Sequence, residues 1–414
     1  DADILEITRE AARLLQSEQR AAYYAWCPHA DVGRRTSFSG VQYEAFRSWA
    51  VYGEFLVLVH MVPEGPGPFA LALQVLHPMR LKTPSDFWSR DDIRDGVELG
   101  PHGEPVAYWI KKSGGVNRPA MSDTSQNFHR IEARDGSRIK VLHGFISTDP
   151  EQVRGISPFA TAMKYFRDLN DYLDAELVSN IVTAAFALFI ETGAADPLTV
   201  AQRFSGLSGA YQTDQQGTQE ERIQELTPGM IYYGQNGERP HPIAAQRPGV
   251  TFSPFVKEIK KAIAISLGIP YSVLFRDVDG VSYAGFRSAL LEAWRTVRQR
   301  RQWFASSLCQ PVYTMLMEEA FLRGWITYDS FDELLPVLTR ADWIGPPKGD
   351  IEPGKEVEAA AEAVNFKLKT RAASVQELGH GDWMNILDQL EEEENEMRAR
   401  NLLTNDTTTT SVVI

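Results

Sequence analysis

The chain has 414 residues, with 55 acidic and 42 basic side chains and a formal net charge of −13 at pH 7. This length allows two or three packing units, because single hydrophobic cores stop growing near ~250 to 300 residues. The acidic balance argues against a broad, sequence-independent phosphate-binding surface, so any contact with nucleic acid is expected to be local or non-adhesive.

The N-terminal residues and the segment after Gly53 show different periodicities. Apolar residues recur at helical spacing near the start and predict an amphipathic helix: Ile4, Ile7, Ala11, Leu14 and Leu15. After Gly53, short β-rich runs such as GEFLVLVHMV and PVAYWIKKS alternate with Gly/Pro turns. We predict an antiparallel β unit over residues 53–145.

A long helix is predicted over residues 157–192. Ser157 is placed as its N-cap, Pro158 as its first residue and Gly193 as its end. Unbroken, it would span ~54 Å at 1.5 Å per residue, which exceeds most globular helices. Such a helix is expected to cross between domains.

The second half of this segment, AELVSNIVTAAFALFIETG, is apolar on nearly every side. It is too short to cross a bilayer, which needs ~20 apolar residues, and charged residues bracket it closely. A membrane span is therefore not expected, and protein must cover this helix all round. A helix central to a monomer core explains the apolarity equally well, but not the length.

A polar, turn-rich module follows over residues 194–251, with a β-like GMIYYG. The next segment repeats the earlier pattern, with Ser253 as cap, Pro254 as first helical residue and Gly268 as stop. Two helices therefore bracket one inserted module.

The C-terminal third is predicted to be mainly helical. After the loop FRDVDGVSY, a helix is expected from about Ala284 to Arg323, kinked at Pro311 because proline removes an internal hydrogen bond. Two further helices are expected around a Thr-Arg turn, and the final TNDTTTTSVVI is expected to be frayed or ordered by a partner.

Signatures of catalysis and metal binding are missing from the sequence, including the phosphate-binding, zinc-protease and hydrolase motifs. His77 and His143 each follow an apolar run and are expected to be buried or turn histidines rather than ligands. The DVDG run begins like a calcium loop, but Ser288 stands where a bidentate Glu is required. The two cysteines, Cys27 and Cys309, match no redox or metal spacing and are expected to be buried, unreactive thiols.

Two helical stripes of basic residues leave alternatives open. Arg295, Arg298 and Arg301 share one stripe beside Trp294, which is compatible with nucleic-acid binding, although a solvated or intersubunit salt-bridge face is favoured. A similar face carries Lys257, Lys260 and Lys261. Its plain interpretation is a solvated surface on a helix that buries Phe255, Ile259 and Ile263.

Six segments, in order along nearly the whole chain, resemble blocks of the lambda-type portal family of tailed bacteriophages. They are YGEFLVLV with LQVLHPMRLKTP, IRDGVELGPHGEPVAYWI, VLHGFISTDPEQVRGISPF, DLNDYLDAELVSNIVTAAFALFI, AIAISLGIPYSVLFRDVDGVSYAGFRSALLEAWR and WIGPPKGDIEPGKEVEAAAEAV. One block alone is a weak signal, whereas six collinear blocks are a strong one. The family's usual Asn-Tyr-Ser-Ser before the helical Arg287 is replaced here by Ser282, Tyr283, Ala284, Gly285 and Phe286.

The resemblance implies an α+β portal fold with wing, stem, clip and crown, assembled as a dodecameric ring around a central channel. The resemblance assigns a part of that fold to each stretch of the sequence. In the N-terminal half, residues 1–155 are the wing, 156–193 the long helix of wing and stem, and 194–251 the clip. In the C-terminal half, residues 252–270 are the second stem helix, 271–285 the tunnel loop, 286–345 the wing helices, and 346–414 the crown and tail.

The implied function is a head–tail connector at one capsid vertex, through which DNA is packaged and later ejected. The implied partners are eleven further copies, double-stranded DNA, the terminase large subunit, the major capsid protein and a head–tail adaptor. No membrane, cofactor, metal or catalytic residue is implied, and the location is the virion, with assembly in the host cytoplasm.

Three groups of site residues follow from this placement. The tunnel loop is assigned Arg276, Asp277, Val278, Asp279, Gly280 and Tyr283. Lys257, Lys260 and Lys261 are assigned as weak phosphate guides on the stem. Ring packing is assigned to Ile181, Val182, Ala185, Phe186 and Phe189.

Two alternatives stay open. One is a monomeric adaptor between capsid and tail, which the particle mass in solution would distinguish from a ring. The other is a metal-dependent processing factor of the assembly pathway, with Asp277, Asp279 and Glu292 as carboxylate ligands.

Overall fold

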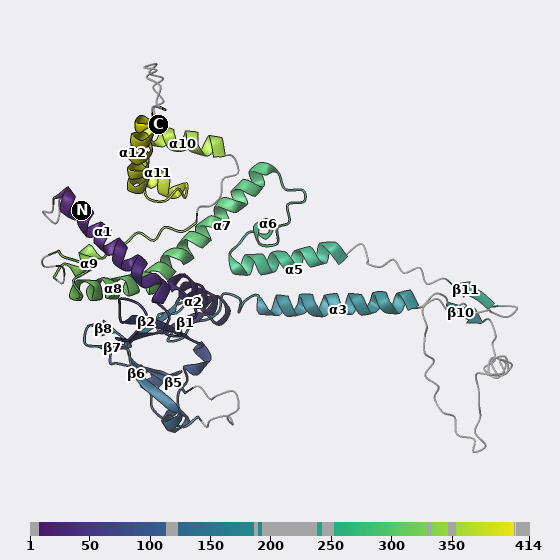
Figure 1. Cartoon of the computed structure of the whole chain (residues 1–414). Helices are drawn as coiled ribbons and strands as arrows, with labels where there is room; N and C mark the ends of the chain where they lie inside the picture. Colours follow the sequence, from purple (N-terminus) through teal and green to yellow (C-terminus); the bar gives the residue numbers. More distant parts are fainter. Residues whose placement is uncertain are drawn as a thin grey trace. The chain divides into compact units, whose positions relative to one another are not determined.

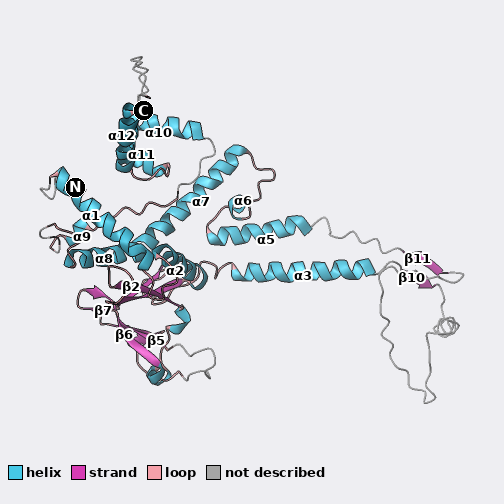
Figure 2. Ribbon diagram, viewed as in Figure 1, coloured by secondary structure: helices cyan, strands magenta, loops and turns pink. Residues whose placement is uncertain are grey.

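The computed structural model describes residues 8–112, 123–185, 189–192, 238–241, 252–328, 331, 333–346, 353–400 and 402. Its helices and strands are labelled in Figure 1 and coloured by type in Figure 2, and together they confirm an α+β fold. The chain divides into two compact units. Unit 1 comprises Asp1–Ala160 and Gly268–Ile414, and unit 2 comprises Thr161–Leu267.

Unit 1 combines helices with an antiparallel β region. The helices are α1 (Arg9–Trp26), α2 (Phe38–Tyr52), α6 (Tyr271–Leu274), α7 (Tyr283–Phe304), α8 (Gln310–Leu322), α9 (Leu335–Leu338), α10 (Pro353–Asn365), α11 (Arg371–Glu377) and α12 (Trp383–Ala399). The strands are β1 (Glu54–Met61), β2 (Leu71–Leu76), β3 (Ile93–Arg94), β4 (Val97–Leu99), β5 (Pro105–Lys111), β6 (Phe128–Glu132), β7 (Arg134–Asp135), β8 (Arg138–Ile139) and β9 (Val141–Phe145).

The predicted antiparallel β unit is confirmed, and it is divided between sheets. One sheet has the order β2-β1-β9, and a second has the order β3-β4-β5-β6. In the first, Leu56 pairs with Leu76 on β2 and with His143 on β9. Because β1 lies between two partners, its first five residues are buried.

Helices α1, α2 and α8 form the main core of unit 1 with the first sheet. Trp26, Phe38, Phe55 and Leu316 are fully buried there. The Trp26 indole donates to the Leu71 carbonyl at 2.8 Å. The Glu319 carboxylate of α8 accepts from the amides of Ala70 and Leu71, which ties that helix to the start of β2.

The predicted interruption of the helix near Pro311 is confirmed, and it takes the form of a π-helical turn. Helix α7 passes into a π-helical turn at Ala305–Cys309, and α8 begins at Gln310. Proline cannot donate to the carbonyl four residues earlier, so the α-helical pattern gives way just before it. At the other end, the Ser282 hydroxyl accepts from the Gly285 amide and caps α7.

The long helix predicted over residues 157–192 is wrong at both ends. In unit 2, α3 runs only over Met163–Ala185. The Ser157 hydroxyl donates to the Ala50 carbonyl and accepts from the Phe159 amide, so it stabilises a turn and does not cap an α-helix.

Residues 189–192 form a strand instead of the end of that helix. The strand β10 (Phe189–Thr192) pairs with β11 (Glu238–His241). The β-branched and aromatic residues of Phe-Ile-Glu-Thr favour a strand once a partner strand is present. Apart from β11, the predicted clip lies outside the described residues.

The second helix of unit 2 ends as predicted. Helix α5 spans Phe252–Leu267, and Gly268 has a left-handed φ of +66°. The predicted start is wrong, because α5 begins at Phe252, before the predicted cap at Ser253. Pro254 lies inside the first turn, where its missing amide donor costs nothing because first-turn amides have no intrahelical acceptor.

Over residues 353–400, the structure has three helices and not the two predicted. Thr370 caps α11 through the Ala373 amide, which matches the predicted Thr-Arg turn. The missed break lies at Gly379 and Gly381, both with positive φ, before Asp382 caps α12 through the Met384 amide. The C-terminal tail after residue 402 lies outside the described residues.

One of the two thiols lies as expected. Cys309 is buried, whereas Cys27 is only half-buried, and both are free of disulfides. Burial raises the pKa of Cys309 to about 12 and also raises that of Cys27, so both stay protonated at neutral pH.

Candidate functional site

The predicted tunnel-loop segment, residues 271–285, is a short helix followed by a closed turn. After α6, Arg276 takes a left-handed φ of +54°, and Gly280 has a φ of +72°. The Val281 amide donates to the Val278 carbonyl at 3.1 Å. The loop is therefore built by local hydrogen bonds and is not an extended strand of chain.

Asp277 lies on the inner side of this turn. Its carboxylate accepts from the Tyr271 hydroxyl and, at 3.2 Å, from the Asp279 amide. The hydrogen bond to Asp277 raises the pKa of Tyr271 to about 12. Val278, Asp279 and Tyr283 are exposed, so they are the side chains that the loop presents outward.

The metal-site alternative fails on geometry. Asp277, Asp279 and Glu292 do not come together as a set of ligands, and Glu292 instead pairs with Arg295 at 3.1 Å. Among the residues the structure describes, no group of three His, Cys, Asp or Glu side chains is arranged to hold a metal ion.

The three predicted lysine guides lie on α5. Lys261 pairs with Glu258 on the same helix at 2.6 Å. The opposite face is only partly covered as expected, because Ile263 is buried while Phe255 is about half exposed, even though its ring contacts Tyr172 of α3.

The apolar helix α3 is poorly covered within the described part of the protomer. Leu177, Val178 and Ile181 are 60, 58 and 61% exposed. Val182 and Ala185 belong to α3, but their side chains are not described. Phe186 lies outside the described residues, and Phe189 begins strand β10 and is not part of the predicted helix.

The arginine stripe on α7 is already partly engaged within the chain. Arg295 pairs with Glu292, and the Arg301 guanidinium lies 5.7 Å from the Trp294 ring centroid. These contacts favour the interpretation as a salt-bridged, packed surface over a nucleic-acid site.

Sequence reasoning missed an ionic cluster at the end of the β unit, here called the junction clamp and formed by Glu54, His143 and Arg154. His143 Nε2 lies 3.0 Å from Glu54 Oε2, and Arg154 Nε lies 2.8 Å from Glu54 Oε1. Arg154 also donates to the carbonyls of Leu81 and Asp95. One arginine thus joins four chain segments.

Hydrogen bonds within the clamp keep the Glu54 carboxylate ionised. Burial by itself raises the pKa of Glu54, but hydrogen bonds from His143 and Arg154 outweigh burial and lower that pKa to about 2. The Gly155 amide also donates to Glu54, at 2.8 Å. His143 is thus a buried histidine, as predicted, whereas His77 is an exposed turn residue whose Nδ1 accepts from the Met79 amide.

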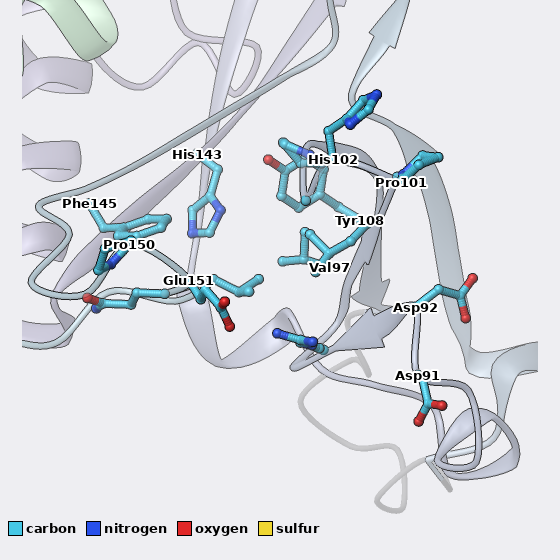
Figure 3. A pocket seen from close by; sticks show the side chains of 17 residues that line it. Asp91, Asp92, Val97, Pro101, His102, Tyr108, His143, Phe145, Pro150 and Glu151 are labelled. Atoms are coloured by element: carbon cyan, nitrogen blue, oxygen red, sulfur yellow. The ribbon is translucent and has the colours of Figure 1, made fainter.

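Beside the clamp lies a pocket of about 560 Å³, shown in Figure 3. His143, Tyr108 and Phe145 form part of its wall, and the loop around Pro101 and His102 lies on the opposite side. The sequence carried no local signal for it, since its walls come from segments near residues 91–108 and 143–153.

Comparison with known proteins decides the family. Residues 2–301 match the family described as phage portal protein, lambda family. The chain belongs to the lambda family of phage portal proteins. The portal protein B of Escherichia phage lambda is 25% identical over 421 residues, covering 96% of this chain and 77% of that protein. The portal protein of Escherichia phage N15 is also 25% identical, with the same coverage of both chains.

One solved structure is a more distant neighbour of this portal protein. A chain from the neck of a native GTA particle, computed with C12 symmetry, has 15% identity and a TM-score of 0.42, covering 89% of this chain and 88% of that one. This likeness is too remote to define the assembly of the present chain.

The family match places the described features in a head–tail connector of a tailed phage. The matched region includes the β unit, the junction clamp, α3, α5 and the loop after α6, and it ends within α7. Over the described residues, no helix of this portal protein is both long and apolar enough to span a bilayer.

Proposed function

We propose that this portal protein assembles as a ring of twelve copies at one capsid vertex, with a central channel for double-stranded DNA. The role is structural, not catalytic. DNA would enter under the action of the terminase large subunit and leave through the same channel into the tail. The major capsid protein and a head–tail adaptor would bind outer surfaces of the ring.

The exposed apolar face of α3 carries this proposal. At 3.6 residues per turn, six exposed residues fall within an arc of about 140°. They are Met163, Phe166, Leu173, Leu177, Val178 and Ile181. Tyr172 lies on the opposite side of the helix and contacts Phe252 and Phe255 of α5. Helix α5 therefore covers one side of α3, and neighbouring copies would cover the other.

Burial of this face is large enough to favour assembly. Covering an exposed leucine, valine or isoleucine contributes up to about 1.5 to 3 kcal/mol each. Repeated at every interface of a closed ring, this term would offset the entropy lost when the subunits associate.

The channel residues are assigned by position along the chain. Asp279, Val278 and Tyr283 would face the DNA, and Asp277 would hold the loop in shape from inside. Acidic groups at a constriction repel phosphate, which would let DNA slide without adhering. Lys257, Lys260 and Lys261 would provide weak, transient phosphate contacts along the stem.

The assembly can be tested by light scattering on the purified chain. A ring would be about twelve times heavier than the 46.4 kDa protomer. Replacing both Leu177 and Ile181 with aspartate should leave the protomer folded but abolish the ring. The matched control is Leu322→Asp on α8, also an exposed apolar residue, which should assemble normally. A folded, solitary wild-type protomer under assembly conditions would rule the proposal out.

The proposal also fixes where the protein acts. The assembled ring would be part of the virion, and the free protomers would be present in the host cytoplasm during assembly. Protomers recovered only from finished particles, and never as an assembly intermediate, would contradict the second statement.

A further inference from the structure

The pocket in Figure 3 is lined by residues between Asp91 and Val153, none of which is assigned to the channel or the stem. Its volume of about 560 Å³ would admit a long side chain together with part of the backbone that presents it. Val97, Tyr108, Phe145 and Pro150 give it apolar and aromatic walls. Walls of this kind hold an aliphatic stem or a flat polar group.

One polar group, the Tyr108 hydroxyl, lines this pocket without a hydrogen-bond partner among the described residues. Tyr108 is 4% exposed, and its hydroxyl makes no hydrogen bond within the described part of the chain. Burial raises the pKa of Tyr108, so the hydroxyl stays protonated. In Figure 3 this hydroxyl and the His143 ring face the same hollow.

The His143 ring adds a flat wall to the pocket. Its Nε2 donates to the Glu54 carboxylate at 3.0 Å, which holds the ring in place. The ring centroid lies 5.5 Å from that of Tyr108 and 5.0 Å from that of Phe145. The three rings therefore form one aromatic surface on which a flat guest can stack.

Carboxylates dominate the rim of the pocket. Asp92 is already paired with Arg90. Asp91 and Glu151 line the same pocket and form no ion pair with any residue that the structure describes. Arg94 is the one arginine that lines the pocket, and it too lacks an ion pair in the described chain. The rim therefore favours a cationic guest over an anionic one.

We propose that this pocket binds an arginine side chain presented by a protein other than this chain. A guanidinium stacks on aromatic rings, donates up to five hydrogen bonds and binds carboxylates in a fixed planar geometry. The Tyr108 and Phe145 rings, the Tyr108 hydroxyl oxygen and the Asp91 and Glu151 carboxylates supply the matching surfaces. Lysine fits less well because its ammonium group is compact and strongly hydrated.

Arg94 opposes such a guest. Its side chain lines the same pocket and carries the same positive charge, so it repels a second guanidinium there. Removing it should therefore raise the affinity for an external arginine. This gain in affinity is opposite to the loss of affinity expected when a residue that binds the guest is removed.

The test uses the full-length chain in its assembled form and the tripeptide acetyl-Gly-Arg-Gly-amide as probe, measured by saturation-transfer NMR. The citrulline analogue, which keeps the shape but not the charge, should bind at least fivefold more weakly. Glu151→Gln and Tyr108→Phe should each weaken the arginine probe by at least threefold. Arg94→Ala should strengthen it. The control Glu64→Gln removes an exposed carboxylate outside this pocket and should change nothing.

Each variant is first checked for an unchanged unfolding midpoint, so that lost binding is not lost folding. Equal binding of the arginine and citrulline probes would overturn the proposal. So would an unchanged affinity of the arginine probe for Glu151→Gln and Tyr108→Phe. A change in particle mass caused by Glu151→Gln would also overturn it, because the occupant would then be a second copy of this chain. None of these outcomes depends on the number of subunits or on the channel assignment.

Discussion

Arg154 donates through Nε to both carboxylate oxygens of Glu54, at 2.8 and 3.0 Å, across 100 residues of sequence. Glu54 opens β1, and its side chain is only 2% exposed. Arg154 lies on the segment that leads out of the β unit toward unit 2. The pair therefore fastens the exit of the β unit to its central strand.

Removing one partner of this pair should be costly. Glu54→Gln leaves the Arg154 guanidinium without its counter-charge in a partly buried site, and we expect a loss of roughly 3 kcal/mol in the free energy of unfolding. Urea unfolding followed by circular dichroism measures it. Glu258→Gln on α5 breaks an exposed pair with Lys261 and should cost less than about 0.5 kcal/mol. Equal costs for the two variants would mean that the clamp has no special role.

The same pair predicts an acid dependence. The pKa of Glu54 is lowered from 4.5 to about 2 in the folded chain, so the unfolded chain takes up a proton first as the pH falls. The stabilisation is complete above about pH 5 and is lost between about pH 4.5 and pH 2, amounting to roughly 3 kcal/mol. Unfolding free energies measured across that range should fall less steeply in Glu54→Gln than in the wild type. Parallel curves would refute the assignment.

Two glycines should be irreplaceable beside the clamp. A Cβ on Gly53 would lie 2.3 Å from the Ile156 carbonyl carbon, and one on Gly155 would lie 2.1 Å from the Gly53 carbonyl oxygen. Both contacts are with backbone atoms, so either Gly→Ala change should cost at least about 2 kcal/mol through forced backbone shifts. Thermal unfolding checks this.

The matched control for the Gly53 variant is Gly136→Ala. Gly136 also has a positive φ, of +61°, but nothing lies within 4 Å of an added Cβ. It should lose only about 1 kcal/mol, the conformational cost of a left-handed alanine. If Gly53→Ala and Gly136→Ala lost the same unfolding free energy, the strain of a left-handed alanine would account for both losses. The close approach of the backbone to Gly53 would then not contribute.

The loop after α6 should loosen when Tyr271 loses its hydroxyl. Tyr271→Phe removes the donor to Asp277, and we expect faster proteolysis between residues 276 and 282 with a change of less than about 1.5 kcal/mol in global stability. Tyr283→Phe is the control, because it also removes a tyrosine hydroxyl, but from an exposed ring. Unchanged cleavage in Tyr271→Phe would show that the turn is held by its backbone alone.

The lysines of α5 offer a functional test. Changing Lys257, Lys260 and Lys261 together to alanine should reduce the length of DNA packaged or retained, because a salt-dependent phosphate contact is lost. Packaged length is measured on DNA extracted from particles. Lys140→Ala in the β unit serves as the control. Normal packaging and retention in the triple variant would remove these lysines from the mechanism.

Local signals in the sequence placed several elements correctly. Gly268 ends α5, the break near Pro311 is present, and alternating β-rich runs do form antiparallel strands. These features depend on a residue's own φ, on a missing amide or on strand periodicity, all of which can be read from a few neighbours. The break at Gly379 and Gly381 carried the same kind of signal and was missed.

Features that depend on distant partners could not be predicted. Ser157 looks like a helix cap, but its hydroxyl donates to the Ala50 carbonyl instead. Phe189 belongs to an apolar helical run by composition, yet it pairs with His241 across a strand ladder. The junction clamp joins residues about a hundred positions apart. No sequence pattern near Glu54 indicates that Arg154 is its partner, and none near Arg154 indicates Glu54.

The π-helical turn at Ala305–Cys309 affects every residue after it. It accommodates one more residue than an α-helical turn, so α8 is rotated by about 100° relative to an uninterrupted continuation of α7. Only with that rotation do Val312, Leu316, Met317 and Ala320 all lie in the core. Deleting one residue from the π-helical turn should therefore rotate these four side chains away from the core. Exchanging one apolar side chain for another would leave that rotation unchanged.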